Sequence, residues 1–329
     1  MSKYTNGLIR WGIIGPGRIA HKFAQDLQQV AGAKLVAVAS RNLNRASEFA
    51  QQYDAPYVYG SYEAIVNCPE LDVVYIASPH IGHHEHTLLC LRAGVAVLCE
   101  KPFAMNRQQV QEMVETARKN NVFLMEALWS RFNPAIWKAL ELVKSGAIGK
   151  VHLLKADFGF KGTFDPENRL FNKNLGGGSL LDIGIYPLFL AYSTLGMPQN
   201  SQATACIGTT GVDETCGMIL KYANDAVAVL DSSFRVKTRC EAFIYGENGT
   251  IYFSPRWHET KQLTVEYDQG ETESFHFERS TWGYEYEIQE VNQCLRNGQK
   301  ESTSWSLNDS LNLIDLLDSV RQLIGLNYE

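Results

Sequence analysis

The first 126 residues alternate between short apolar runs and segments whose apolar residues recur at helical spacing. Apolar runs of strand length lie at residues 8–14, 34–39, 57–59, 71–77, 95–102 and 122–125. Helical spacing follows at residues 19–30, 45–53, 62–67, 83–93 and 106–120, and Asn106 is a suitable N-cap for the last of these segments. This alternation predicts a doubly wound α/β domain built on a parallel sheet.

From residue 151 the pattern changes, because strand-like runs now follow one another without helices between most of them. These runs lie at residues 151–160, 201–207, 216–222, 226–234, 241–245, 250–253, 263–268 and 273–277. Turn signals such as Asn248-Gly249 separate several of them, which predicts an antiparallel meander. Two helical segments, 284–297 and 308–325, close the chain. An antiparallel sheet can leave one face uncovered, and such a face is a candidate surface for oligomerisation.

A glycine-rich turn joins the first strand to the first helix. Residues 15–20 read Gly-Pro-Gly-Arg-Ile-Ala, which is the pattern G-x-G-x-x-A in the required context of strand, turn and helix start. Gly15 permits the turn and Gly17 lets the backbone approach a pyrophosphate. The helix N-terminus, with Arg18 and Ile19 in its first turn, offers N–H groups to the phosphates. We therefore expect dinucleotide binding; the alternative is a glycine-rich turn that binds no nucleotide.

The end of the second strand indicates which dinucleotide is preferred. Sites for NAD usually place an acidic residue about 20 residues past the glycines, where it binds the ribose 2′-OH. Here Ser40 and Arg41 follow the strand, and Arg45 comes a turn later. A hydroxyl and two guanidinium groups suit a 2′-phosphate, so we predict NADP over NAD. Alternatively, Arg41 stacks on the adenine and both cofactors bind.

Two further strand ends carry polar residues. Ligands bind at the carboxyl ends of the strands in an open parallel sheet. The segment 95–102 ends in Glu100, Lys101 and Pro102, so Lys101 is placed where chemistry occurs, although a surface lysine in a loop is the alternative. The neighbouring strand end supplies further residues expected at the cofactor: Ser78, Pro79, His80 and His83.

The four histidines between residues 80 and 86 also allow a metal site to be considered. No cysteine or paired carboxylate completes a ligand set, so we expect no metal. One or two of these histidines should lie near the cofactor and the others in solvent. After the sixth strand, residues 126–134 are dense in groups able to contact a ligand, and we assign Trp129 and Arg131 to the cofactor site. Core packing is the alternative for Trp129.

The second half contains one polar pair within an apolar helix. A triple glycine at 176–178 precedes this helix, on which Asp182 and Tyr186 stand four residues apart and so share a face. A buried aspartate beside a tyrosine can orient a substrate hydroxyl while the tyrosine relays its proton. The alternative is a capped helix in which Asp182 bonds to backbone amides.

Composition limits the classes of protein to which the chain can belong. A chain of 329 residues predicts two domains, and 45% hydrophobic residues supply sizeable cores. A net charge of −6 argues against a nucleic-acid surface. The sequence shows no secretory signal and no apolar run of the roughly 18 residues that a membrane span needs. Seven scattered cysteines fit reduced thiols, so we expect a cytoplasmic protein.

Taken together, these motifs resemble a known family. The glycine turn, Glu100-Lys-Pro102, residues 126–132 (Glu-Ala-Leu-Trp-Ser-Arg-Phe) and residues 176–186 (Gly-Gly-Gly-Ser-Leu-Leu-Asp-Ile-Gly-Ile-Tyr) occur in the order seen in the Gfo/Idh/MocA oxidoreductases. Within that family the chain looks most like the branch of dimeric dihydrodiol dehydrogenases and NADP-dependent D-xylose dehydrogenases. The resemblance covers residues 5–329.

The resemblance implies a fold and an oligomer. It implies an N-terminal Rossmann domain, residues 1–126, and a substrate-binding and oligomerisation domain, residues 127–329, with a large, open, mostly antiparallel sheet. The final helices can pack back on the Rossmann domain. The outer face of the sheet is expected to make a homodimer or a dimer of dimers.

The resemblance also implies roles for three residues. Lys101 would lie between nicotinamide and substrate, and Asp182 and Tyr186 match the family's aspartate and its histidine or tyrosine. A tyrosine with a pKa of about 10 needs a nearby cation to transfer a proton at neutral pH, and Lys101 could supply it. The family's usual Pro-Asn is Pro79-His80 here, which is a departure, whereas His83 falls where the family commonly has a histidine.

The sequence thus predicts an NADP-dependent oxidoreductase acting on a sugar, polyol or vicinal diol, or on the matching carbonyl. Tyr186 would exchange the proton with help from Lys101, and Asp182 would orient the substrate or the lysine. Two other readings stay open: a dinucleotide-binding sensor without turnover, and an NAD-linked inositol-type dehydrogenase. Which sugar or diol is used, the direction of the reaction and the conformation of residues 161–174 do not follow from the sequence.

Overall fold

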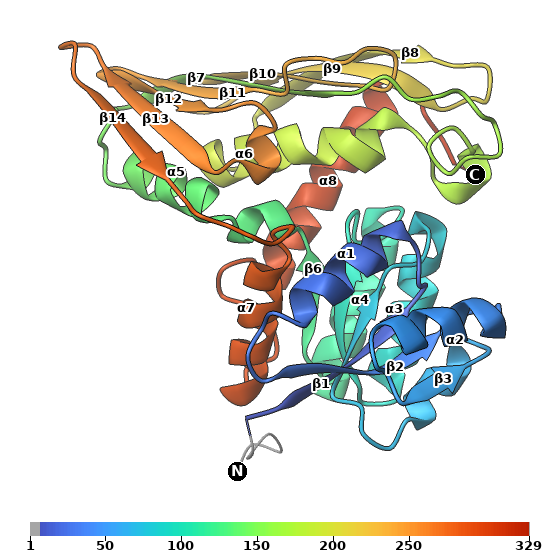
Figure 1. Ribbon diagram of the computed structural model, residues 1–329. Coiled ribbons are helices and arrows are strands. Elements are labelled where there is room, and N and C mark those ends of the chain that lie inside the picture. The colour runs from blue at the N-terminus through green and yellow to red at the C-terminus, as the bar shows by residue number, and fades with distance from the viewer. Residues whose placement is uncertain (1–6, 329) are drawn as a thin grey trace. The chain divides into compact units, whose positions relative to one another are not determined.

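The computed structural model describes residues 7–328, and the chain forms two compact units (Figure 1). Unit 1 consists of Met1–Trp129 and Ser280–Leu311. Unit 2 consists of Ser130–Arg279 and Asn312–Glu329. A segment from late in the chain therefore completes the N-terminal unit.

Unit 1 is built on a six-stranded sheet in which all neighbouring strands are parallel. The order is β3-β2-β1-β4-β5-β6, with β1 Ile9–Ile14, β2 Ala33–Ala39, β3 Tyr57–Tyr59, β4 Val73–Ile76, β5 Ala96–Glu100 and β6 Leu124–Ala127. The predicted doubly wound sheet is confirmed. The chain runs from β1 to β2 on one side and resumes at β4 on the other. The carboxyl ends of β1 and β4 thus flank the switch point at which such sheets bind ligands.

The helices of the first segment of unit 1 are α1 Arg18–Leu27, α2 Leu43–Gln52, α3 His83–Arg92 and α4 Arg107–Asn120. Helix α4 forms as the sequence predicts, because the Asn106 side chain accepts a hydrogen bond from the Gln109 N–H at 2.9 Å. Its apolar face is buried at Val110, Met113, Val114 and Ala117. The predicted helix at 62–67 is a 3₁₀ helix, Glu63–Asn67.

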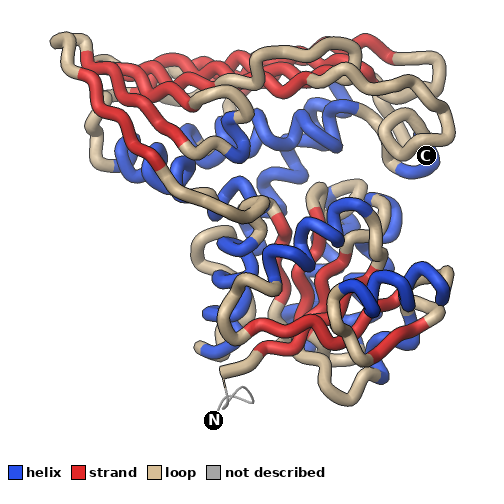
Figure 2. Tube along the Cα trace, viewed as in Figure 1, coloured by secondary structure: helices blue, strands red, loops and turns tan. Residues whose placement is uncertain are grey.

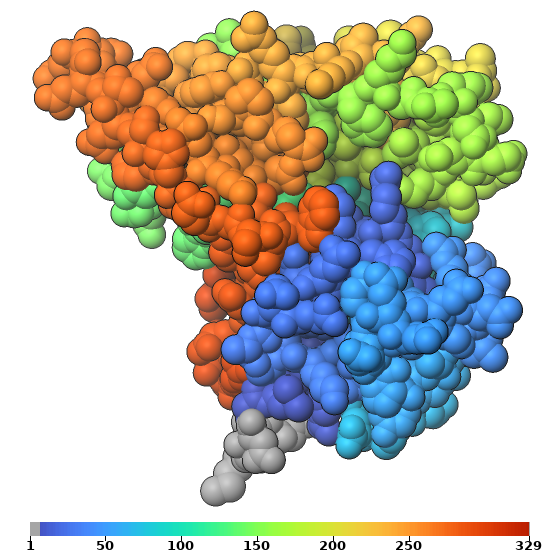
Figure 3. All heavy atoms as spheres, viewed as in Figure 1, coloured from blue at the N-terminus to red at the C-terminus, as the bar shows by residue number. Residues whose placement is uncertain are grey.

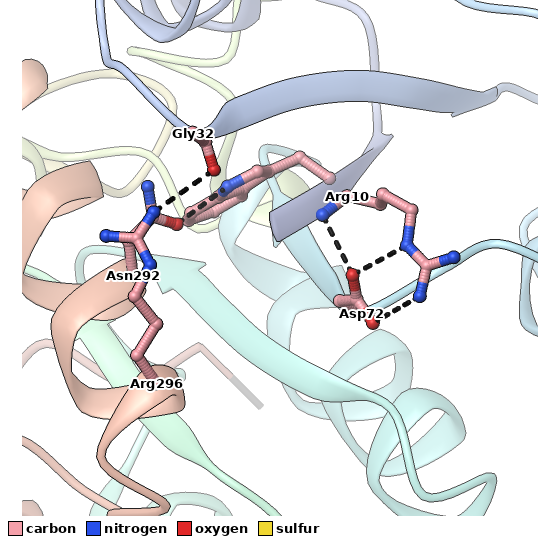
Figure 4. A network of polar contacts seen from close by, with 6 residues as sticks. Arg10, Gly32, Asp72, Asn292 and Arg296 are labelled. Carbon is pink, nitrogen blue, oxygen red and sulfur yellow. Dashed lines mark hydrogen bonds and ion pairs between the residues drawn. The ribbon is translucent and has the colours of Figure 1, made fainter. Parts of the chain in front are cut away.

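Helix α7 (Glu285–Arg296) is anchored to the start of the sheet in unit 1. The indole Nε1 of Trp11 donates to Asn292 Oδ1 at 3.2 Å, and Arg296 Nη2 donates to the Gly32 carbonyl at 3.3 Å (Figure 4). Beside them, Arg10 and the nearly buried Asp72 form an ion pair at 2.8 Å. In Figure 3 the atoms of α7 lie directly against those of the first strand. A C-terminal helix is thus part of the unit that contains the parallel sheet.

Unit 2 contains an eight-stranded sheet of order β14-β13-β12-β11-β7-β10-β9-β8. Its strands are β7 Val151–Gly159, β8 Asn200–Ile207, β9 Asp213–Lys221, β10 Val227–Ser233, β11 Ala242–Gly246, β12 Gly249–Phe253, β13 Gln262–Tyr267 and β14 Thr272–His276. The mostly antiparallel sheet is confirmed, but the predicted simple meander is wrong. Strand β7 lies in the middle and pairs in parallel with β10, because the long helical connection after β7 lets later strands add on both sides of it.

Helices of unit 2 cover one face of this sheet (Figure 2). They are α5 Pro134–Lys144 and α6 Ile185–Leu195, and α8 Leu307–Leu323 enters from the unit boundary. Residues 173–195 are long and apolar enough to cross a membrane by length and composition, yet 89% of that window is buried inside the protein, as in a core helix. The seven cysteines are free thiols, and Cys206 is exposed while the others are buried.

Candidate functional site

The glycine turn lies at the switch point of unit 1. Gly15 has φ +84°, and a Cβ there would lie 2.9 Å from both the Ala77 carbonyl and the Ser78 nitrogen. Gly17 is different: it caps α1, and a Cβ would meet only the Gly15 carbonyl, at 3.9 Å. Gly15 is therefore required by the protein's own packing. Gly17 instead leaves space beside the N-terminus of α1, where a phosphate can approach.

The residues predicted to choose the cofactor follow β2 next to this turn, since the Gly15 N–H donates to the Ala39 carbonyl at 3.1 Å. Ser40 is buried, and its Oγ accepts a hydrogen bond from a backbone N–H at 3.2 Å. The exposed Arg41 lies over the ring of Tyr62, 5.9 Å from its centroid. Arg45 Nε donates to the carbonyl of Pro16 within the glycine turn at 3.1 Å. The residues that follow this strand thus offer two guanidinium groups and a hydroxyl, and they include no carboxylate.

The end of β4 is tied to the end of β5 through one histidine. The ring nitrogens of the buried His83 lie 2.8 Å from the carbonyls of Ser78 and of Pro102. Burial lowers the pKa of His83 to about 4, and the two carbonyls act in the opposite direction. His80 and Ser78 are also buried here. The structure therefore brings together the residues predicted at these two strand ends.

The other histidines of α3 have separate partners. His84 pairs with Glu112 of α4 at 2.9 Å, and His86 Nδ1 lies 2.9 Å from the Ser78 hydroxyl. Among residues 7–328, no cluster of three or more histidine, cysteine, aspartate or glutamate side chains could hold a metal ion.

Lys101 lies one residue past its strand, because β5 ends at Glu100. Its side chain is partly exposed, whereas Glu100 is buried. Glu100 accepts hydrogen bonds from the Tyr75 hydroxyl and, at 3.2 Å, from the Lys101 N–H. The backbone at Lys101 is thus bound to a buried carboxylate of the sheet.

The polar segment after β6 is divided between the units. Glu126 accepts hydrogen bonds from the Phe103 N–H and the Trp305 indole, both at 3.1 Å, and burial raises its pKa to about 7. Trp129 is buried and stacks on Tyr284, with centroids 5.1 Å apart. Arg131 belongs to unit 2, where its guanidinium lies 4.3 Å from the centroid of Trp137. Each of the two predicted cofactor residues thus contacts an aromatic ring of its own unit.

The predicted Asp182 and Tyr186 lie in unit 2 and are both buried. The helix that carries them begins as a π-helical stretch, Leu180–Gly184, and continues as α6. Wider turns of this kind often occur at functional sites. Asp182 Oδ1 accepts a hydrogen bond from the side chain of Arg169, at 2.9 Å from Nη1.

Three residues around this pair were missed by the sequence reading. They are Arg169, in the loop whose conformation did not follow from sequence, Phe158 of β7 and His258. The ring of Tyr186 lies 5.4 Å from that of Phe158 and 5.3 Å from that of the buried His258. Phe158 and His258 also stack on each other, 4.2 Å apart. No local pattern marks these residues, because they are distant from Tyr186 in the chain.

The glycine run before the helix is fixed by a buried carboxylate. Asp213 Oδ2 accepts hydrogen bonds from the Ser179 hydroxyl and the Leu180 N–H, both at 2.7 Å. A Cβ on Gly178, which has φ +120°, would lie 2.3 Å from Asp213 Oδ1. The Tyr328 hydroxyl donates to the carbonyl of Gly177. The start of the helix that bears Asp182 therefore depends on close backbone approach and on the C-terminal residues.

Comparisons with known proteins agree with this geometry. Residues 9–128 match the family model "Oxidoreductase family, NAD-binding Rossmann fold", and residues 136–252 match the "GFO/IDH/MocA C-terminal domain". The trans-1,2-dihydrobenzene-1,2-diol dehydrogenase of Xenopus tropicalis is 39% identical over 97% of this chain and 99% of its own length. The human enzyme of the same name is 37% identical over 97% of this chain and 98% of its own length.

Solved structures are also similar to this chain over nearly its full length. The 3-ketoreductase KijD10 of Actinomadura kijaniata, in complex with NADP and TDP-benzene, superposes with a TM-score of 0.86 at 26% identity, over 96% of this chain and 98% of that one. The aldose-aldose oxidoreductase of Caulobacter crescentus, with glycerol, gives 0.88 at 24% identity, over 97% and 98%, and so shows a shared fold.

Proposed function

Because this chain belongs to the GFO/IDH/MocA family of oxidoreductases, we propose that it transfers a hydride between NADP and a sugar, polyol or vicinal diol, or the matching carbonyl. The observation that carries the proposal is similarity over the full length to dehydrogenases of a vicinal diol, together with a glycine turn at the switch point. Unit 1 would hold the dinucleotide and unit 2 the substrate. The first test is oxidation of NADPH with a panel of carbonyl sugars and diketones, and reduction of NADP with diols.

Arg41 and Arg45 support the choice of NADP. Each guanidinium can form charge-assisted hydrogen bonds to a 2′-phosphate, which are worth about 1.5–3 kcal/mol each. Replacing Arg41 by alanine should therefore raise the Kd for NADPH about 10- to 100-fold and leave that for NADH nearly unchanged. Titration of both cofactors by fluorescence checks this. Equal losses for NADPH and NADH would contradict a role for Arg41 at the 2′-phosphate.

Three residues carry the proposed proton chemistry. The bound dinucleotide supplies or accepts the hydride. Tyr186 exchanges the proton of the reacting hydroxyl, and Lys101 donates a hydrogen bond to the same oxygen and stabilises its developing negative charge. Asp182 orients the substrate, and its own orientation is fixed by Arg169. The burial of Tyr186 against Phe158 and His258 supports this assignment, because it leaves the phenol few orientations.

Matched substitutions test these roles. Tyr186→Phe and Lys101→Met should each lower kcat by about 10²- to 10⁴-fold while NADPH binding stays intact. Tyr192→Phe is the control on the same helix, since its hydroxyl accepts a hydrogen bond from Asn312. Lys119→Met is the control for an exposed lysine of unit 1. If either catalytic variant turns over at the rate of its control, the role assigned to that residue is wrong.

We also propose that the outer face of the unit 2 sheet joins two copies of this chain in the cytoplasm. This face presents Ile219 and Val229, which are 48% and 41% exposed, and the stacked rings of Phe243 and Tyr252. In the strand register Lys155 lies between Val229 and Phe243, so the proposed surface consists of an aliphatic pair and an aromatic pair on either side of one lysine. Val229→Glu should convert a dimer into a monomer in sedimentation equilibrium, whereas Leu43→Glu, at an exposed position of α2, should not. A wild-type monomer would contradict the proposal.

A further inference from the structure

One buried carboxylate of unit 1 has no part in the proposed reaction. Glu287 lies in the first turn of α7 and is 0% exposed. Within residues 7–328, neither of its carboxylate oxygens has a hydrogen-bond partner. An ionised carboxylate buried without donors is strongly unfavourable, and such a group takes up a proton instead. The geometry therefore indicates a neutral carboxylic acid.

Other acidic and phenolic groups act on Glu287 from the neighbouring elements: Glu100 at the end of β5, Asp26 of α1, Glu285 of α7 itself and Tyr75 of β4. Burial, and then the charges of these carboxylates, raise the pKa of Glu287 well above its usual value. The charge of Asp26 is already compensated by three backbone N–H donors, at 2.8 to 3.0 Å, from Trp282, Gly283 and Tyr284.

Glu100 is the neighbour that connects Glu287 to the proposed chemistry. It accepts the Tyr75 hydroxyl at Oε1 and the Lys101 N–H at Oε2. Tyr75 is 0% exposed, and its ring stacks on Phe23 with centroids 3.7 Å apart, so the position of its hydroxyl is fixed. An ionised Glu100 can accept both hydrogen bonds at once, whereas a protonated oxygen would be a donor.

We propose that Glu287 holds a proton in the native protein, which leaves Glu100 as the ionised member of the pair and so fixes the turn that carries Lys101. Glu287, Glu100 and Tyr75 are then positioning residues, since each acts through Lys101. The catalytic consequence rests on the proposed function of Lys101. The protonation of Glu287 does not depend on the function of Lys101.

The protonation is tested by stability as a function of pH. A carboxyl group whose pKa is raised on folding binds more protons in the native than in the unfolded state, so its contribution to stability decreases as pH rises above its unfolded pKa. Glu287→Gln cannot ionise, so the free energy of unfolding of the variant relative to wild type should increase steadily from about pH 4.5 upward. Glu48→Gln, at an exposed position of α2, should show no such increase. Parallel curves for Glu287→Gln and wild type would overturn the proposal.

Infrared spectroscopy supplies a second readout of this protonation. Burial raises the pKa of Glu126 to about 7 and those of Asp213 and Asp231 to about 6, so these groups are ionised at pH 9. A protonated carboxylic acid band that remains after these groups have ionised, and that is lost in Glu287→Gln, is expected from Glu287. Its absence would overturn the proposal.

The positioning role is tested by Tyr75→Phe, which removes one donor to Glu100. We expect kcat to fall about 10- to 100-fold while the Kd for NADPH is unchanged, because the ammonium group of Lys101 is displaced. A purely structural role would lower the free energy of unfolding and leave kcat intact, and that result would overturn the positioning. Normal turnover by Lys101→Met would instead refute the proposed function and leave the pH and infrared results on Glu287 unaffected.

Discussion

Arg169 donates from Nη1 to Oδ1 of Asp182 at 2.9 Å, and this pair joins a surface loop to the helix that carries Tyr186. The aspartate side chain is 9% exposed and the arginine 43%, so the contact lies at the edge of the buried region. The carboxylate is thereby held in one orientation by a residue that solvent can reach.

Removing this contact should affect turnover more than stability. Arg169→Gln removes the charged partner of Asp182, and small misplacements of a positioning group can cost about 10²-fold in rate. We expect kcat/KM to fall by about 10- to 100-fold, while a pair this exposed contributes at most about 1 kcal/mol to folding. Steady-state kinetics and urea unfolding measure the two effects. Glu167→Gln, at an exposed position of the same loop, is the control, and equal activity of the two variants would contradict the assignment.

The two motif glycines should respond differently to alanine. Gly15→Ala combines a positive φ with a Cβ 2.9 Å from backbone atoms, so we expect it to destabilise unit 1 by about 1–3 kcal/mol. Gly17→Ala has room for its Cβ and an ordinary φ of −96°, so it should lose less stability than Gly15→Ala, with only the cost of alanine at an N-cap. It should nevertheless bind NADPH at least about tenfold more weakly, because the methyl group occupies the space proposed for the pyrophosphate. Unchanged affinity in Gly17→Ala would place the phosphates elsewhere.

The contrast between these glycines and Arg169 shows what the sequence could predict. The turn and the polar strand ends are local patterns beside the parallel sheet of unit 1, and Asp182 and Tyr186 lie on one continuous helix of unit 2. Arg169 and His258 come from segments without periodicity, and they meet Asp182 and Tyr186 only through tertiary packing.

The predicted order of strands in unit 2 was wrong for a related reason. Turn residues predict that consecutive strands pair, and β11 to β14 do so. The pairing of β7 with β10 and β11 depends instead on where the chain returns after α6, which no local signal specifies. The anchoring of α7 to Trp11, 281 residues earlier, is unpredictable in the same way.

Glu126 should make stability depend on pH. Its pKa is raised by burial to about 7 in the folded protein, from a usual value of 4.5. The native state therefore holds the proton while the unfolded state releases it, and the contribution of Glu126 to stability decreases from about pH 4.5 to pH 7. Glu126→Gln should lack this decrease. Its free energy of unfolding relative to wild type should therefore rise between pH 4.5 and pH 7. Urea unfolding across this pH range measures this difference.

Two substitutions of Asp213 separate the free energy lost by burying its charge from the stabilisation that its hydrogen bonds provide. Burial raises its pKa from 3.8 to about 6, and both of its hydrogen bonds are made by Oδ2, while Oδ1 has no partner. An asparagine can keep both bonds through its carbonyl oxygen and removes the charge. Asp213→Asn should therefore gain stability relative to wild type as pH rises from about 4 to 6, by roughly 3 kcal/mol in total.

Asp213→Ala should behave in the opposite way, since it leaves the Ser179 hydroxyl and the Leu180 N–H without an acceptor at the start of the helix that bears Asp182. Each buried donor left unsatisfied costs about 1–3 kcal/mol, so the alanine variant should be less stable than wild type at pH 7. Its kcat/KM should also fall, because the helix start is no longer fixed. Urea unfolding at pH 4, 5, 6 and 7 for both variants separates the two effects. If Asp213→Asn were destabilised by the same amount at every pH, the prediction would be wrong. Asp213 would then stabilise the protein through its charge and not through the geometry of its hydrogen bonds.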